Sequence, residues 1–384
     1  MDTIICGSTA YHYWRMPPVV QLLVAGPEDD CLVRGLLGAD ELIALRMELA
    51  ATLPLSVACA PGPSWRNAGE DARRIREIHH LLAPAVGLPV EILVEDAKRC
   101  HRSKLVTPRL WSACLPFGSL SQISTDVCIT SPAFTVLQLA SRFGVVRTAL
   151  LASELCGSFA VFKSPAPLAR ALQGLIDRGR LPELDGWRPS LKDGRLTDLW
   201  MRPPLLEPSD LCQVAATSES RNGRATLESA LGLVVPGAAS PFEVQAGALL
   251  GFPKSLGGEG LAGLRFNERV PLTSEARLLC GKECCYCDIY WEDGVDVECQ
   301  SAQHHDNLDS YVSDSERTAA LKAMGIEVVP LTYGQLSSPD RFDAVVRLIA
   351  EIRGISLRKK TPRQLMKSAE LRNELLWNWQ DLPN

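Results

Sequence analysis

Two acidic residues on neighbouring β-prone segments are the feature of this sequence that most directly suggests chemistry. Asp288 lies in the segment 285–291 and Glu298 in the segment 295–300, with the dipeptide Asp293-Gly294 between the two segments. Asp-Gly between two alternating segments is a strong hairpin signal. The length of the connecting loop therefore decides which side chains face one another.

Two loop lengths can be considered. A two-residue turn would place Asp288 opposite Cys299, whereas a three-residue loop with Gly294 in the left-handed conformation places Asp288 opposite Glu298. Only the second register sorts the side chains by polarity, so we expect the three-residue loop. Its apolar face would carry Cys287, Ile289, Trp291, Val295, Val297 and Cys299, and its polar face Tyr286, Asp288, Tyr290, Asp296, Glu298 and Gln300.

In this register the Cβ atoms of Asp288 and Glu298 would lie roughly 5 Å apart, where like charges destabilise a strand pair. Either one carboxyl group is protonated or a cation lies between the two. Oxygen ligands with room for water suit Mg²⁺ or Mn²⁺ better than Zn²⁺. A solvated sheet face with ordinary acidic residues is the alternative.

The overall composition is that of an ordinary globular protein. The chain has 384 residues, of which 46% are hydrophobic and 22% charged, which favours two domains and disfavours a disordered or fibrous protein. No apolar stretch reaches the roughly 20 residues of a membrane helix, and no basic region precedes an apolar core at the N-terminus. We therefore expect a cytoplasmic protein with no membrane partner.

Cysteine usage indicates reduced thiols. Thirteen cysteines are scattered through the chain, an odd number that does not suggest a disulfide framework. Four of them lie close together in the sequence and include a Cys-x-x-Cys, although no second pair follows at zinc-ribbon spacing. A zinc-bound interaction module is therefore a further hypothesis for the cluster Cys280, Cys284, Cys285 and Cys287.

The charge distribution bears on nucleic-acid binding. The formal net charge of −5 argues against a protein that coats nucleic acid nonspecifically. A local basic stretch runs from Arg353 to Arg372 and includes Arg358, Lys359 and Lys360. Such a stretch can lie along a phosphate backbone, and a solvated helix face explains it equally well.

The sequence predicts four regions. Residues 1–162 form an α+β domain, 163–216 a linker with one short helix at Leu168–Asp177, 217–353 a second domain, and 354–384 a basic helical tail. Ser131 before Pro132 and Ser240 before Pro241 each indicate the start of a helix.

The second domain is expected to run in the order helix, three strands, helix, strand, helix. The helix that follows Ser240 comes first, a weak strand at Arg277–Cys280 precedes the hairpin, and a helix ending near Gly325 follows it. A strand at Ile326–Leu331 and a helix at Asp340–Arg353 complete the order.

This order, with an acid on the second strand and Glu-x-Gln on the third, resembles the PD-(D/E)XK nuclease fold. It is more closely similar to small endonuclease-like domains related to the very-short-patch repair endonuclease, over roughly residues 236 to 350. That family's pattern is Asp, then Glu-x-Asp-Gly-x-x-His, then Asp-x-x-Arg, then Leu and Gly, with an acid on the first helix. The corresponding residues here are Asp288, the segment from Glu298 to His304, the segment from Asp314 to Arg317, Leu321, Gly325 and, on the first helix, Glu243.

The N-terminal part, with Gly7-Ser8-Thr9-Ala10 and Ile129-Thr130-Ser131-Pro132, is similar to the module that precedes such domains in proteins related to abortive-infection antitoxins. Together the two resemblances imply a restriction-endonuclease-like αβββαβ core with a mixed sheet, preceded by an α+β domain. The implied activity is divalent-metal-dependent cleavage of DNA, in phage defence or DNA repair.

The resemblance also implies roles for individual residues. Asp288, Glu298 and the main-chain carbonyl of Cys299 would bind Mg²⁺ or Mn²⁺. Gln300 would position the nucleophile, Glu243 would hold a second metal or a water, and His304 or His305 would transfer a proton. Arg317 would contact phosphate or form an ion pair with Asp314 one helical turn away.

Gln300 departs from the family pattern. Nucleases of the wider fold have Lys here and the smaller family often has Asp, whereas the amide of Gln300 supplies no charge. Ser301 also replaces Gly. The alternative function is therefore a DNA-binding regulator or antitoxin-like protein whose nuclease fold has lost catalysis.

Overall fold

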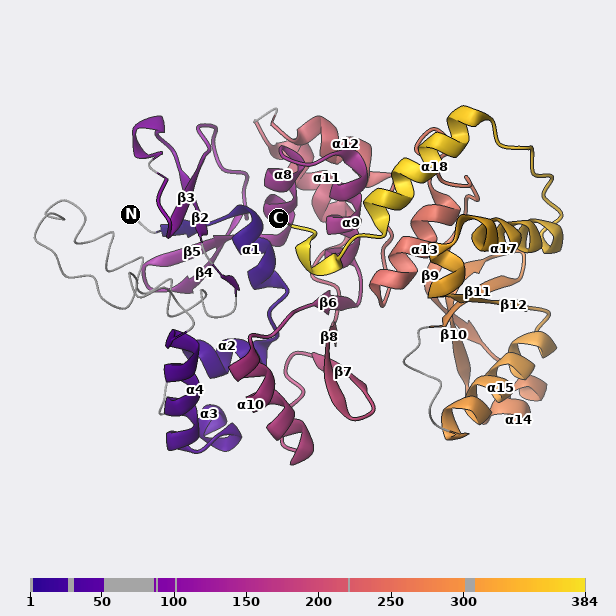
Figure 1. Ribbon diagram of the computed structural model, residues 1–384, viewed down its shortest axis with the longest axis horizontal. Coiled ribbons are helices and arrows are strands. Elements are labelled where there is room, and N and C mark those ends of the chain that lie inside the picture. Colours follow the sequence, from indigo (N-terminus) through magenta and orange to yellow (C-terminus); the bar gives the residue numbers. More distant parts are fainter. Residues whose placement is uncertain are drawn as a thin grey trace, which may run out of the picture. The chain divides into compact units, whose positions relative to one another are not determined.

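The structure is a computed structural model that describes residues 3–26, 31–51, 86–87, 89–100, 102–219, 222–300 and 308–383, with the backbone alone for 99 and 308–314. The chain folds into two compact units (Figure 1). Unit 1 comprises Met1–Thr148, Phe159–Leu231 and Pro383–Asn384, and unit 2 comprises Ala149–Ser158 and Gly232–Leu382. Both units combine helices with sheets, so the expected α+β class is confirmed.

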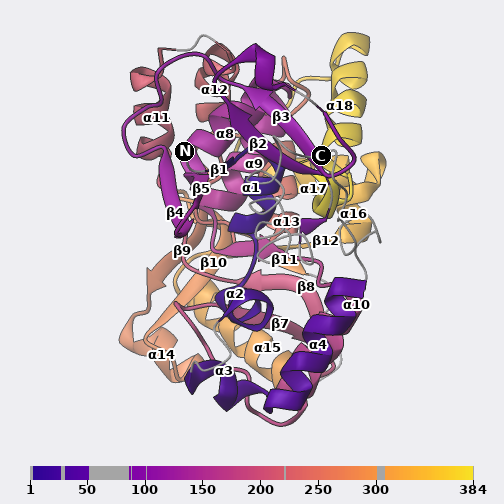
Figure 2. The same cartoon turned by 90° about the vertical axis from the view of Figure 1, so that its left-hand side faces the viewer.

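Unit 1 is built on a five-stranded mixed sheet of order β3-β2-β1-β5-β4, whose strands are labelled in Figure 2. The strand β1 is parallel to β5 and antiparallel to β2, and the helix α1 packs against β2 and α8. The strands are β1 (Thr3–Ile5), β2 (Val90–Val94), β3 (Val106–Leu110), β4 (Leu120–Ser124) and β5 (Val127–Thr130).

The helices of unit 1 bury apolar side chains against this sheet and one another. As the sequence predicts, α8 has Ser131 as its N-cap, with the hydroxyl accepting from the Phe134 N–H, and Pro132 in its first turn. The helices are α1 (Gly7–Trp14), α2 (Pro18–Ala25), α3 (Cys31–Leu36), α4 (Ala39–Ala51), the 3-10 helix η1 (Ala97–Arg99), α8 (Pro132–Ala140), α10 (Ala166–Asp177), α11 (Pro208–Thr217) and α12 (Arg224–Leu231).

The stretch 163–216 is folded, and the prediction of a linker there is wrong. It contains α10 and the strands β7 (Arg188–Lys192) and β8 (Arg195–Met201), which form a three-stranded antiparallel sheet with β6 (Phe159–Val161) in the order β6-β8-β7. Trp200 of β8 is almost completely buried in the core of unit 1. The boundary between the units therefore lies after Leu231 rather than at 216.

Unit 2 contains a four-stranded mixed sheet of order β12-β11-β10-β9. The strands β9, β10 and β11 form an antiparallel meander, and β12 is parallel to β11. Figure 1 shows α13 and α17 on one side of these strands and α14 and α15 on the other. The strands are β9 (Arg265–Pro271), β10 (Cys284–Trp291), β11 (Val295–Gln300) and β12 (Glu327–Thr332).

The helices of unit 2 begin with α13, where Ser240 caps the first turn as predicted by accepting from the Glu243 N–H. The prediction of a weak strand at Arg277–Cys280 is wrong, because this stretch belongs to a helix. The first strand of the meander is β9. The helices are α13 (Pro241–Gly251), α14 (Ser274–Cys280), α15 (Leu308–Ala323), α16 (Tyr333–Ser337), α17 (Pro339–Ile352), α18 (Pro362–Leu375) and the 3-10 helix η2 (Trp379–Asp381).

The predicted C-terminal tail is helical, but it is a packed part of unit 2 and not an appendage. Leu371, Arg372 and Leu375 of α18 are buried, and the Arg372 guanidinium donates to the Leu336 carbonyl at 2.6 Å.

Unit 2 also includes Ala149–Ser158, which contains the C-terminal part of α9 (Val145–Cys156) from Ala149 onward. Ser153 on this helix accepts a hydrogen bond from the Val235 N–H at 2.9 Å, and the buried carboxylate of Glu154 accepts one from the Trp379 indole at 2.6 Å. A segment that is distant in sequence thus satisfies polar groups near both ends of unit 2.

Candidate functional site

The hairpin between β10 and β11 has the predicted register. Ile289 pairs with Val297, Tyr290 with Asp296, and Trp291 with Val295. Gly294 has a φ of +87°, and its N–H donates to the Trp291 carbonyl at 2.9 Å. The loop is therefore the expected three-residue loop, while the ladder ends at the pair of Ile289 and Val297 and does not include the expected pair of Asp288 and Glu298.

The predicted apolar face is correct for Ile289, Trp291, Val295 and Val297, which are all buried. It is wrong for Cys287, which packs in the apolar cluster that contains Ala320 and Leu321 of α15.

Ile289 lies on the other side of the sheet, together with its cross-strand partner Phe266. The ring of Phe266 lies so close to Gly247 of α13 that a side chain at 247 would collide with it. Cys287 and Ile289 therefore point to opposite sides of the sheet, although they lie two residues apart.

The alternation is interrupted at Asp288. Asn267, which faces it on β9, has a left-handed φ of +49°, and the ladder contains the pairs on either side of Asp288 but not Asp288 itself. The Asp288 carboxylate accepts a hydrogen bond from the Cys299 N–H at 2.8 Å. The irregularity on β10 thus coincides with a left-handed residue on the neighbouring strand β9, and a strict period of two does not anticipate it.

The negative charge of Asp288 is not balanced by its surroundings, and its pKa is raised. Burial raises the pKa of Asp288 to about 8, and the negative charges of Glu298 and Glu243 add to the effect. The hydrogen bond from Cys299 opposes the rise in pKa without cancelling it. The like-charge conflict that the sequence predicts at this position is therefore present.

Glu298 is compensated by Arg317 of α15. The Arg317 Nη1 donates to Glu298 Oε1 at 2.5 Å, and Nη2 donates to Oε2, which makes a two-pronged ion pair. Burial lowers the pKa of Arg317, but the hydrogen bonds and charge of Glu298 outweigh burial and raise it overall. The expected partner Asp314 lies where the structure describes only the backbone.

Asp296 is a buried acid whose importance the sequence alone does not reveal. Its side chain is 0% exposed, and neither carboxylate oxygen has a hydrogen-bond partner of normal geometry among the described residues. Burial and the charge of Glu298 raise the pKa of Asp296 to about 7, and Arg317, at 3.5 Å, opposes this. The available signal was the Asp-x-Glu spacing, which places Asp296 and Glu298 on one face of β11.

Glu243 lies at the start of α13 and is 6% exposed. It accepts hydrogen bonds from the Ala239 N–H at 2.7 Å, the Ser240 hydroxyl at 2.8 Å and the Asn267 amide at 2.7 Å. Burial raises the pKa of Glu243, these hydrogen bonds counteract that, and the charge of Glu298 adds to the rise. Glu243 is thus electrostatically linked to the site and holds the left-handed Asn267 opposite Asp288.

The remaining predicted site residues lie at or beyond the end of β11. Gln300 is the last residue of that strand, half-buried and paired with Thr332 of β12. Burial, followed by the charge of Asp288, raises the pKa of the Cys299 thiol well above its usual value. His304 and His305 lie outside the described residues.

The three basic residues predicted to bind DNA differ in their surroundings. Arg358 and Lys359 are exposed. Lys360 donates to Glu259 at 2.6 Å and to Asp343 at 2.8 Å, so its charge is already neutralised within unit 2.

The donor chemistry of the site fits a hard divalent cation. No group of three or more His, Cys, Asp or Glu side chains is arranged as a metal site in the part of the chain that the structure describes, the cysteine cluster at 280–287 included. Mg²⁺ commonly binds through one or two carboxylates together with water and substrate phosphate. Asp288 and Glu298 are carboxylates of this kind, but both oxygens of Glu298 accept hydrogen bonds from Arg317, and the oxygens of Glu243 accept three hydrogen bonds.

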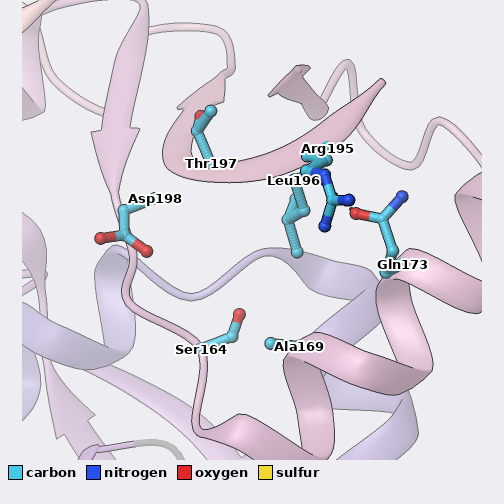
Figure 3. Close-up of a pocket in the computed structure, with 7 residues that line it drawn as sticks. All are labelled: Ser164, Ala169, Gln173, Arg195, Leu196, Thr197 and Asp198. Atoms are coloured by element: carbon cyan, nitrogen blue, oxygen red, sulfur yellow. Dashed lines mark hydrogen bonds between the residues drawn. The ribbon is translucent and has the colours of Figure 1, made fainter. Parts of the chain in front are cut away.

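Two pockets lie away from the acidic residues. One, of about 200 Å³ in unit 1, has Arg195 and Gln173 side by side at one end and Asp198 at the other, with Ser164 between them (Figure 3). Gln173 is already engaged, since it donates to Asp177 at 2.7 Å and to the Gly194 carbonyl at 3.0 Å.

The second pocket, of about 400 Å³, lies beside the hairpin turn in unit 2 and is lined by Trp291 and Arg353. The Arg353 guanidinium pairs with Asp293 at 2.7 Å and stacks over the Trp291 ring. Neither pocket includes Asp288 or Glu298.

Comparison with known proteins returned no matching family model, no matching curated protein and no matching solved structure. No helix in the described part of the chain combines the length and the apolar character needed to cross a membrane.

Proposed function

We propose that unit 2 is a divalent-metal-dependent DNA endonuclease that hydrolyses phosphodiester bonds, acting in phage defence or DNA repair. The observation that carries this proposal is Asp288, a half-buried carboxylate next to Glu298 whose pKa is raised to about 8. A perturbed carboxylate beside a second carboxylate is typical of catalytic and metal-binding sites.

In this proposal Asp288 and Glu298, with the main-chain carbonyl of Cys299, hold Mg²⁺ or Mn²⁺. The bound ion would lower the pKa of a water ligand and stabilise negative charge on the scissile phosphate. Gln300 orients the water or a phosphate oxygen through its amide, and His304 transfers a proton. Glu243 keeps Asn267 and the start of α13 in place behind Asp288.

Exposed basic residues would bind the DNA backbone. Arg358 and Lys359 are the members of the predicted set that are exposed. Contacts of this type supply affinity without sequence preference.

The second candidate is a DNA-binding regulator or antitoxin-like protein that retains the fold without catalysis. Two observations favour it. Glu298 is already paired with Arg317, and Gln300 brings no charge to the end of β11.

Cleavage of plasmid DNA with Mg²⁺ or Mn²⁺ distinguishes the two candidates. We expect nicking by the natural protein, none by Asp288→Ala, and equal or faster nicking by Gln300→Lys. A preorganised charge near the phosphate can change a rate by about a hundredfold. Intact DNA binding without cleavage by either the natural protein or Gln300→Lys would favour the regulator.

A further inference from the structure

Among the described residues of the acidic site, Arg317 is a cation that lies close to two carboxylates at once. Its guanidinium binds both oxygens of Glu298 and lies 3.5 Å from the fully buried Asp296. Asp296 has no other close cation among the described side chains that form ion pairs. The side chain of Arg317 is only 19% exposed, so solvent screens these charges weakly.

This arrangement conflicts with cation binding by Glu298. A carboxylate that already accepts two charge-assisted hydrogen bonds is partly neutralised, and a guanidinium beside it repels a second positive charge. Binding of a divalent cation to Glu298 therefore requires Arg317 to loosen its hold or to move.

Among the described residues, Arg317 also has one donor without an acceptor. Its Nε is buried and has no hydrogen-bond acceptor among the described residues. A guanidinium with one free donor in a buried site can accept an additional anionic partner, and the planar array of its donors matches phosphate.

We propose that Arg317 is an exchangeable cation: it pairs with Glu298 and Asp296 when no metal is bound, and it turns to a phosphate oxygen of the DNA when Glu298 binds a divalent ion. The inference rests on the proposed function and adds to it a control on metal binding. It also supplies a positive charge that Gln300 lacks.

The test measures Mn²⁺ binding to the DNA-free protein by titration calorimetry. Arg317→Gln removes the competing charge, and we expect it to bind Mn²⁺ about tenfold more tightly than the natural protein, which corresponds to about 1.4 kcal/mol. The same variant should cleave DNA at least about a hundredfold more slowly, because the charge that stabilises the phosphate is lost. If Arg317 had a merely structural role, its replacement would lower both the Mn²⁺ affinity and the rate of DNA cleavage.

The matched control is Arg277→Gln on α14. Arg277 is also ion-paired, to Glu283 at 3.5 Å, but its carboxylate partner is not one of the acids of the site, and its Nε donates to the Leu272 carbonyl. Its Mn²⁺ affinity and cleavage rate should match those of the natural protein.

Arg317→Lys provides a second test in case Arg317→Gln does not fold. Lysine retains the charge but cannot hold both oxygens of Glu298, so Mn²⁺ binding should tighten by about threefold. Mn²⁺ affinity that is unchanged or weaker in the Arg317 variants overturns the exchange. Tighter Mn²⁺ binding without any cleavage by the natural protein would instead support the exchange and contradict the endonuclease.

Discussion

Replacement of Asp288 by Asn should stabilise the protein at high pH and leave it unchanged at low pH. The pKa of Asp288 is about 8 in the folded state and about 4 in an unfolded chain. Between these values the folded protein binds one proton more than the unfolded protein. The free energy of unfolding therefore falls as the pH rises from 4 to 8, and becomes independent of this group above pH 8.

The magnitude follows from the pKa difference. Each unit is worth about 1.4 kcal/mol, so four units set an upper limit of about 5 kcal/mol. The pKa of Asp288 depends on the charges of Glu298 and Glu243, and relaxation of the protein around the charge lowers the cost of ionising it. We therefore expect Asp288→Asn to raise the free energy of unfolding by about 2 kcal/mol at pH 8. An Asn side chain can still accept the hydrogen bond from Cys299.

The assay is urea unfolding in the absence of divalent metal at several pH values. Glu327→Gln, an exposed position on β12, removes the same charge and serves as the control. The reasoning would be refuted if Asp288→Asn were no more stable than the natural protein at pH 8, or if its advantage grew toward acidic pH.

Two further predictions concern neighbouring charges. Glu298→Gln should abolish cleavage and destabilise the metal-free protein by about 2 kcal/mol, because Arg317 and Asp296 remain without the second carboxylate; an unchanged unfolding midpoint in urea would contradict this. Arg358→Gln and Lys359→Gln should each weaken DNA binding and reduce its salt dependence by about one unit of slope, whereas Lys360→Gln should leave that slope unchanged; fluorescence anisotropy over a range of NaCl concentrations measures all three.

Local signals in the sequence were sufficient for the hairpin and the helix starts. Asp293-Gly294 and the polarity of the flanking residues determined the register, and Ser131 and Ser240 marked their helices correctly. These features depend on a few adjacent residues, so neighbours in the sequence carry the necessary information.

The errors in the fold predicted from the sequence have identifiable physical causes. The hairpin of β7 and β8 turns at Asp193-Gly194, with φ values of +50° and +74°, which is the same Asp-Gly signal in a stretch whose prolines favoured a linker. In α14, the apolar residues Leu278 and Leu279 suggested a strand, yet both are exposed on a helix. The Thr273 cap and the left-handed Gly281 define that helix.

The partnership of Arg317 could not be predicted, because it joins α15 to β11 across 19 residues. The sequence shows only the neighbour Asp314 at helical spacing. Likewise, the complete burial of Asp296 depends on how α15 packs over the sheet, which the alternation of β11 does not specify.

Unit 2 is built from two separate stretches of the chain, because it includes the C-terminal part of α9. A fragment that begins at Gly232 would lack Ser153 and Glu154, and would leave the Val235 amide and the Trp379 indole without their acceptors. Recombination at a single breakpoint therefore cannot transplant unit 2 intact into another protein. Unit 2 must therefore evolve together with the upstream stretch Ala149–Ser158, unlike a domain formed by one continuous segment.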